Sequence, residues 1–273
     1  IFLGAAVIVG LALLTRTSLP SGWRDWVRII PPAVFGSALP FTLFAIGERS
    51  VDSGVAGVLN ATTPLWALLL TMLVGTERHV GLLRTVGLLV GFGGTLLIFA
   101  PWHAAGLASW GALACLLAAI SYALSYTYIS RFLLGRMSSV TLSAAQLTGG
   151  AVLVAVIAPA TGGLDQVHLG VGPLVAVTIL GVFGTGIAQV MNNRLLADEG
   201  VMTATSVGYL LPVVSVLLGA LFLHEDLNAR ILIGMVVVLA GVALSRKRSA
   251  RAAAPQVAQV QTSLRSVAQR ESS

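Results

Sequence analysis

Apolar residues along this chain are gathered into long tracts that contain no Asp, Glu, Lys or Arg, and each tract is dense in Leu, Val, Ala, Gly and Ile. An α-helix needs about 20 predominantly apolar residues to cross the ~30 Å hydrocarbon core of a bilayer. Each tract is long enough for one crossing, and the longest is long enough for two. The tracts are 53–76, 85–130, 137–164, 166–193 and 200–224. This pattern predicts an all-α integral membrane protein that crosses the membrane many times.

Turn residues and charges divide the apolar pattern into nine predicted spans. They are 1–14, 26–47, 53–74, 81–100, 107–130, 139–158, 172–193, 201–223 and 230–245. The connections between them are short and leave no room for a soluble domain. From residue 246 the composition changes to Arg, Ala, Ser and Gln, so 246–273 is predicted to be a disordered basic tail.

Composition supports the membrane assignment. Hydrophobic residues make up 56% of the chain, charged residues 10%, and the mean hydropathy is +0.93, whereas a soluble domain carries about 25% charged residues. The net charge of +6 lies in short connections and in the tail, so no nucleic-acid partner is expected. Four scattered histidines and the single Cys115 form no metal site, and no cofactor motif is present.

The distribution of basic residues predicts the orientation. If the tail is cytoplasmic, fourteen Arg and Lys residues lie on the cytoplasmic side, and only Arg49 and Arg230 lie outside. Cytoplasmic connections of membrane proteins are enriched in Lys and Arg. A cytoplasmic C-terminus is therefore expected.

A sequence repeat appears at an offset of 148 residues. Val34-Phe35-Gly36-Ser37 recurs as Val182-Phe183-Gly184-Thr185, Pro64 matches Pro212, and Glu77 matches Glu225. The repeat unit contains five spans, and an odd number makes the second copy enter the membrane from the opposite side. Inverted repeats of this kind are typical of transporters, in which two pseudo-symmetric halves rock against each other.

The same offset predicts one further span. The second copy begins with the span at 107–130, whose partner would precede residue 1. We therefore expect an intact protein of ten spans in two five-helix bundles, of which nine are visible here and the first is missing.

These features resemble the EamA-type transporters of the drug/metabolite transporter superfamily. The resemblance rests on Pro64 thirteen residues before Glu77-Arg78, followed by a glycine-rich span, in a pattern that occurs twice; the second copy departs from it at His224-Glu225-Asp226. It implies a first EamA repeat at 1–100, a second at 107–245, and a place in the bacterial plasma (inner) membrane. It also implies transport of small metabolites, commonly amino acids or amphiphilic compounds.

The two matched prolines indicate a candidate substrate cavity, because proline frees a carbonyl group in mid-helix, and helix interruptions in both halves point to a central site. The candidates around them are Asn60, Thr63, Pro64, Ser206, Tyr209 and Pro212. A kink needed only for helix packing remains an equally weighted alternative.

Further polar residues are predicted to line this cavity. Tyr122 and Tyr126 are four residues apart and share one helix face, and Gln146 and Gln189 lie within neighbouring spans. The adjacent asparagines at 192 and 193 are interpreted as gate or capping groups.

Two sets of residues at helix ends and on helix faces have structural alternatives. Glu77, Arg78 and Glu225 are gate candidates, although anchoring of helix ends at the interface is the favoured interpretation. Gly87, Gly91 and Gly94 share one face, and Gly234 and Gly241 repeat that spacing. They predict close helix packing, and a homodimer through these helices is a further expectation.

The combined prediction is a secondary transporter, not an enzyme, that moves small metabolites by alternating access, in the direction of efflux. Its expected partners are a small-molecule substrate and the lipid bilayer. The alternative is an integral-membrane enzyme that modifies lipids, against which the connections offer few acids, bases or metal ligands.

Overall fold

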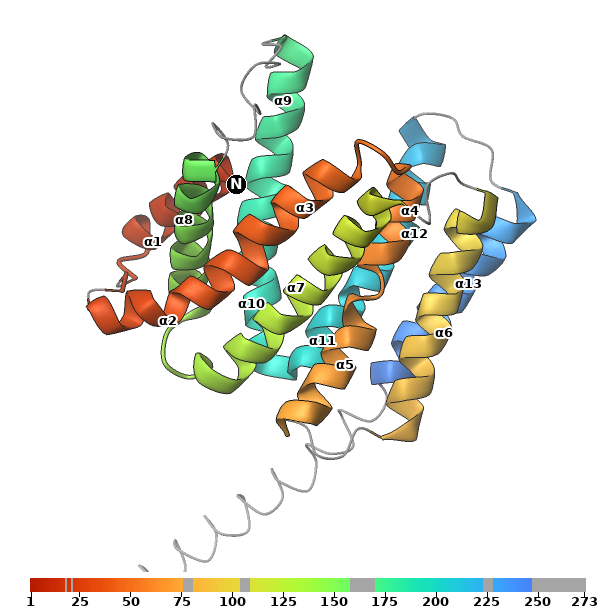
Figure 1. Cartoon of the computed structure of the whole chain (residues 1–273), viewed down its shortest axis with the longest axis horizontal. Helices are drawn as coiled ribbons and strands as arrows, with labels where there is room; N and C mark the ends of the chain where they lie inside the picture. Colours follow the sequence, from red (N-terminus) through yellow and green to blue (C-terminus); the bar gives the residue numbers. More distant parts are fainter. Residues whose placement is uncertain are drawn as a thin grey trace, which may run out of the picture.

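A computed structural model describes residues 1–17, 19–20, 22–75, 81–103, 109–157, 170–222 and 228–246. Every regular element in these ranges is helical (Figure 1). Each of the nine predicted spans coincides with a helical segment, continuous or interrupted. Seven of these segments are long and apolar enough to cross a membrane, and the helices at the two ends of the described chain, α1 and α13, are shorter apolar helices. The prediction of a multi-pass helical protein is confirmed.

The helices follow one another along the chain. Their bounds are α1 Phe2–Leu14, α2 Trp23–Ala33, η1 Val34–Ala38, α3 Leu39–Gly47, α4 Ser53–Asn60, α5 Thr63–Val74, α6 Leu82–Phe99, η2 Pro101–His103, α7 Trp110–Phe132, α8 Ser139–Ile157, α9 Val171–Ile179, η4 Leu180–Ile187, α10 Ala188–Glu199, α11 Val201–Ser206, η5 Val207–Tyr209, α12 Leu210–Phe222 and α13 Ala229–Arg246.

Two of the spans change from α-helix to π-helix and back. The π-helix η1 joins α2 to α3, and the π-helix η4 joins α9 to α10. A π-turn shifts the hydrogen-bond register and is often found at functional sites. Both π-helices contain the residues of the recurring sequence motif at Val34 and Val182.

Two other spans are interrupted beside a proline. Pro64 has no N–H to bond the Asn60 carbonyl, and α4 ends there; the Thr63 hydroxyl donates to this carbonyl instead, at 2.7 Å. In the corresponding span, the 3₁₀-helix η5 separates α11 from α12, shortly before Pro212. The predicted helix interruptions are therefore present near both prolines.

The most extensive contact between two described helices joins α6 to α13, which lie side by side in Figure 1. Glycines bring the two backbones together. A Cβ atom added at Gly94 would lie 2.6 Å from the Val238 nitrogen, and one added at Gly241 would collide with the Gly91 nitrogen. These glycines serve packing within one chain. A homodimer stays a prediction, and the exposed faces of the two helices, around Leu89 and Val236, are the surfaces free to form it.

A second group of helices packs around α7 and α8. The short helix α1 packs against α8 and η4, while α8 also packs against α2 and η1. The helix α7 packs against α3, α4, α5 and η1. By contrast, α9 contains no buried residue, and it projects at the top of Figure 1.

Candidate functional site

Gln146 lies at the centre of a buried polar cluster between the interrupted helices. Its side chain, on α8, is 1% exposed. The Nε2 atom donates to the Gly36 carbonyl at 3.3 Å and approaches the Ser37 hydroxyl at 3.4 Å, and both of these residues belong to η1. One amide therefore links α8 to the first π-helix.

Pro40 and the π-turn explain why these carbonyls need outside partners. Pro40 lies four residues after Gly36 and has no N–H to bond its carbonyl. In the π-turn, the Leu39 N–H bonds the Val34 carbonyl, so the Phe35 carbonyl loses its usual donor as well. Two neighbouring carbonyls of η1 are bonded by side chains instead: Ser121 donates to Phe35 at 2.8 Å, and Gln146 bonds Gly36. Glycine at position 36 permits this approach, because a Cβ atom there would lie 2.6 Å from the Gln146 Nε2 atom.

The other side of Gln146 contacts α10, which continues from the second π-helix. Its Oε1 atom accepts from Gln189 Nε2 at 3.4 Å and from Asn193 Nδ2 at 3.5 Å. Asn193 also donates to the Ser143 hydroxyl at 2.9 Å. We call Ser37, Ser143, Gln146, Gln189 and Asn193 the amide network. It joins η1, α8 and α10.

Aromatic residues of α7 lie next to this network. Asn192, which precedes the network residue Asn193, donates from Nδ2 to the Tyr126 hydroxyl at 3.0 Å. Tyr122 lies on α7 one helical turn before Tyr126, and its ring packs against that of Phe44, with the ring centroids 6.3 Å apart. The structure thus brings Tyr126 to α10 and places Tyr122 against α3.

Four of the predicted cavity residues come together in this region: Tyr122, Tyr126, Gln146 and Gln189. The two asparagines of α10 were interpreted from the sequence only as gate or capping groups. The structure gives them more central contacts. Sequence reasoning had one usable signal, since a side-chain amide in hydrocarbon requires hydrogen-bond partners.

The residues at the matched prolines form separate local groups. Asn60 and Thr63 bond each other at the helix break beside Pro64: the Thr63 hydroxyl donates to the Asn60 carbonyl at 2.7 Å and lies 3.5 Å from the Asn60 Oδ1 atom. Ser206 donates to the Thr203 carbonyl, one turn earlier, at 2.9 Å.

Tyr209 is fully buried against Gly91 of α6. Within the part of the chain that the structure describes, its hydroxyl has no hydrogen-bond partner. Pro212 is also buried, in the first turn of α12. No hydrogen bond between described residues connects either proline group to the amide network. The gate candidates Glu77, Arg78 and Glu225 lie outside the described residues.

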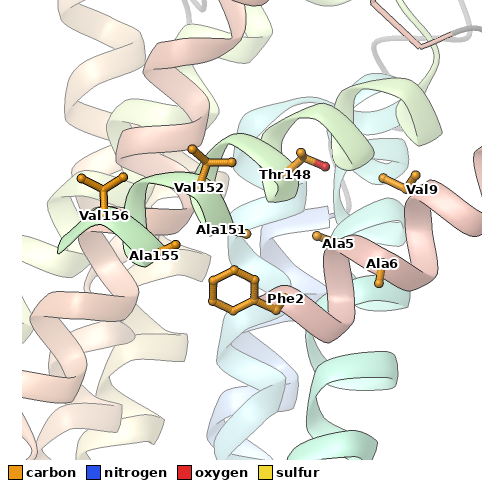
Figure 2. A pocket seen from close by; sticks show the side chains of 9 residues that line it. All are labelled: Phe2, Ala5, Ala6, Val9, Thr148, Ala151, Val152, Ala155 and Val156. Atoms are coloured by element: carbon orange, nitrogen blue, oxygen red, sulfur yellow. The ribbon is translucent and has the colours of Figure 1, made fainter. Parts of the chain in front are cut away.

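A groove of about 440 Å³ lies on another face of α8, between α1 and α8 (Figure 2). In Figure 2 the ring of Phe2 reaches from α1 toward α8, and Thr148 carries the single polar group of the lining. None of the predicted cavity residues lines it. The lining residues are Phe2, Ala5, Ala6, Val9, Thr148, Ala151, Val152, Ala155 and Val156.

The amide network consists of neutral donors and acceptors, whose chemistry is hydrogen bonding. In the described ranges no three His, Cys, Asp or Glu side chains are grouped as metal ligands. A buried set of amides and hydroxyls can orient a polar solute in a medium of low dielectric constant.

Comparison with known proteins places the chain among membrane transporters. It is 29% identical over 255 residues to the uncharacterized inner membrane transporter YedA of Escherichia coli K12, covering 89% of this chain and 78% of that protein. It is 23% identical to the uncharacterized transporter YvbV of Bacillus subtilis, over 91% and 83%.

A solved crystal structure superposes with a TM-score of 0.75 at 22% identity, covering 90% of this chain and 85% of that one, which supports the fold. The family description of EamA-like transporters matches residues 1–100 and again residues 109–246. These matches indicate a transporter rather than an enzyme. The chain belongs to the EamA-like transporter family.

Proposed function

We propose that this protein is a secondary transporter that exports small metabolites, such as amino acids or amphiphilic compounds, by alternating access. The observation that carries the proposal is the amide network, which is buried in the membrane-spanning part of the protein and bridges two interrupted helices. A polar group buried in hydrocarbon is costly unless it is hydrogen-bonded, and polar residues that face the interior of a membrane protein commonly mark a solute pathway. Broken helices around a central polar site are typical of secondary transporters.

Alternating access requires two halves that exchange positions, and we propose the inverted repeat of 1–100 and 107–245 for this role. The π-helices η1 and η4 support it, since they lie at positions related by the 148-residue offset. The two proline-associated interruptions support it in the same way. Two packed helix pairs would lie on the pseudo-two-fold axis, which would exchange the two members of each pair: α1 with α8, and α6 with α13.

The contacts between helices are also consistent with ten spans. In the proposed symmetry, α8 against η1 corresponds to α1 against η4. The helix α7 packs on α3 and α5. Its counterpart in the first repeat, the proposed tenth span, would by the same symmetry lie against α10 and α12. With this repeat we propose ten spans, and the distribution of basic residues favours a C-terminus in the cytoplasm.

In this proposal, solute binds between the halves and exchanges with the hydrogen bonds of Gln146, Gln189 and Tyr126. The groups at the two proline breaks, Asn60, Thr63 and Pro64 in one half and Ser206, Tyr209 and Pro212 in the other, would face the same path in another state of the cycle. Glu77, Arg78 and Glu225 would act at the two ends of the path as gates.

Flux through reconstituted vesicles tests the proposal. The purified full-length protein, placed in vesicles loaded with a metabolite extract, should release specific solutes when a proton or sodium gradient is imposed. Mass spectrometry of the external medium would identify them, with protein-free vesicles as the control. Turnover of a vesicle lipid without gradient-dependent release of any solute would replace the transporter with a lipid-modifying enzyme.

A further inference from the structure

We infer that the Oδ1 atom of Asn193 accepts a hydrogen bond from an N–H group of the transported solute, so that the protein selects solutes with a protonated amino group. This inference rests on the proposed transport function and adds a specificity-determining residue to it. It follows from the direction of each hydrogen bond in the amide network.

The directions are set by a backbone carbonyl, which can only accept. Because the Gly36 carbonyl is the partner of Gln146, the amide of Gln146 must turn its Nε2 toward η1. Its Oε1 atom then faces α10 and must receive donors. Gln189 and Asn193 therefore turn their NH₂ groups toward Gln146.

The hydroxyl group of Ser143 independently requires the same orientation of the Asn193 amide. Ser143 donates its single proton to the Ser139 carbonyl at 2.7 Å. Toward Asn193, at 2.9 Å, the same hydroxyl can only accept. Both partners thus require Nδ2 of Asn193, and its Oδ1 atom must point elsewhere.

That oxygen is buried and has no partner. Asn193 is 1% exposed, and no described residue donates to its Oδ1 atom. Native structures rarely leave a buried polar atom unpaired, and such an atom calls for a specific explanation. The neighbouring Asn192 repeats the pattern: its Nδ2 atom bonds Tyr126, and its Oδ1 atom is likewise unpartnered within the described ranges.

The unpaired acceptor of Asn193 suits a solute that supplies donors, and the second unpaired acceptor, on Asn192, lies on the adjoining face of α10. A primary ammonium group has three N–H donors and bonds amide oxygens more strongly than a neutral donor does. A solute that offers only acceptors at this place would leave the Asn193 oxygen unpaired. A trimethylated nitrogen keeps the positive charge of the ammonium group but has no N–H donor. Comparing the two forms therefore distinguishes the effect of hydrogen bonding from the effect of charge.

The test compares matched solutes in the same vesicles. Full-length protein is reconstituted, and counterflow of phenylalanine, leucine and glutamine is measured beside their N,N,N-trimethyl derivatives. The wild-type protein should transport the amines about tenfold or more faster than the trimethyl forms, the size expected for a lost hydrogen bond to a charged group. Asn193→Leu should bring this ratio close to one.

The ratio is taken within one preparation, so it does not depend on how much of a variant folds. Asn193→Ser provides a smaller polar replacement, which should also lower the ratio if the leucine variant is not recovered. Thr178→Val is the matched control, because Thr178 lies on the exposed helix α9 and bonds only the Leu174 carbonyl in the described structure. It should keep the wild-type ratio.

The outcomes separate this inference from the proposed function. Equal transport of amines and trimethyl derivatives, or a wild-type ratio retained in Asn193→Leu, overturns the role of Asn193 and leaves transport intact. The same holds if the metabolite extract yields flux only of solutes without N–H donors. Absence of gradient-dependent flux for every solute overturns the transport function, and this inference falls with it.

Discussion

Gln146 connects two parts of the chain that are more than 100 residues apart in sequence. Its NH₂ group bonds the Gly36 carbonyl, and its oxygen receives donors from Gln189 and Asn193. Each of these bonds is long, between 3.3 and 3.5 Å, so no single one is strong. The importance of the residue comes from the number of buried groups that depend on it.

Gln146→Leu removes all of these bonds while keeping a side chain of similar size. We expect the free energy of unfolding to fall by about 1–3 kcal/mol, because the Gly36 carbonyl and the Asn193 amide lose a partner away from water. Thermal unfolding of the purified protein in detergent measures this. Gln189→Leu is the control, since Gln189 is half-buried and makes one bond of 3.4 Å, so its effect should be smaller. Equal effects of the two variants would contradict the central position of Gln146.

Gly36 and Gly184 occupy equivalent positions of the sequence repeat but have different surroundings. A Cβ atom at Gly36 would meet both Ser125 and Gln146, whereas one at Gly184 would meet the flexible end of Leu180 at 2.9 Å. We expect Gly36→Ala to lower thermal stability and flux, at a cost of about 1–3 kcal/mol for overpacking. Gly184→Ala should behave like the wild type. An equal loss of stability in both variants would contradict the prediction that Gly36 is required by its close contacts with Ser125 and Gln146.

At the scale of helices, the chain contains two kinds of element with different tasks. Four of the described spans are interrupted, and at η1 the freed carbonyls are bonded by side chains of neighbouring helices. The α6–α13 pair is continuous and is held together by close backbone contact between glycines. Small residues permit such approach in membranes, where dispersion contacts replace the hydrophobic effect between helices. We expect this pair to remain rigid while the interrupted spans move.

Glycine substitutions test the α6–α13 contact. Gly94→Val would place atoms against the Val238 nitrogen and should force the two helices apart, with a loss of about 1–3 kcal/mol in the free energy of unfolding. Gly93→Val is the matched control on the same helix, because a Cβ at Gly93 meets no atom within 4 Å. Thermal unfolding of both variants measures the difference. Similar melting temperatures for the two would show that the contact contributes little.

At the scale of the whole molecule, function depends on how the helix bundle is inserted in the membrane. The α3–α4 connection carries Arg49, and the α7–α8 connection carries Arg136; both side chains are exposed. The proposed orientation places Arg49 outside and Arg136 in the cytoplasm. The single Cys115 is fully buried, so it offers little background for cysteine labelling.

The orientation can therefore be measured with single cysteines in a Cys115→Ala protein. In intact cells, a membrane-impermeant maleimide should label Arg49→Cys and leave Arg136→Cys unlabelled until the cells are opened. Both positions are exposed, so a difference in labelling reports the side of the membrane rather than burial. The reverse pattern would invert the orientation, and labelling of both positions in intact cells would contradict the alternation of spans.

Several features of the fold were predictable from the sequence because they depend on local properties of the chain. The length of an apolar tract determines whether a helix can cross a bilayer, and all nine predicted spans fall on helical segments. Pro64 and Pro212 indicated where helices would be interrupted, since a missing N–H acts within one turn. The π-helices were not predicted, because the recurring Val-Phe-Gly motif marks a repeat and carries no signal for a change of helical register.

The candidate site was predictable only in part. Gln146, Gln189 and Tyr126 were selected as polar residues within apolar tracts, and the structure brings them to one region. The roles of Asn192 and Asn193 depend on which residues of α7 and α8 face them, and spacing along one helix does not contain that information. The proline groups, selected on the same grounds, form no hydrogen bond with the network among the described residues.

The sequence by itself determined that this chain is a multi-pass helical membrane protein of transporter type, because apolar length, charge placement and the matched prolines are properties of short segments. Only the tertiary structure decided which polar groups meet. Hydrogen-bond direction propagates from the Gly36 carbonyl through Gln146 to Asn193 across three separate helices. Such pairing depends on the packing and rotation of those helices, which no single segment encodes.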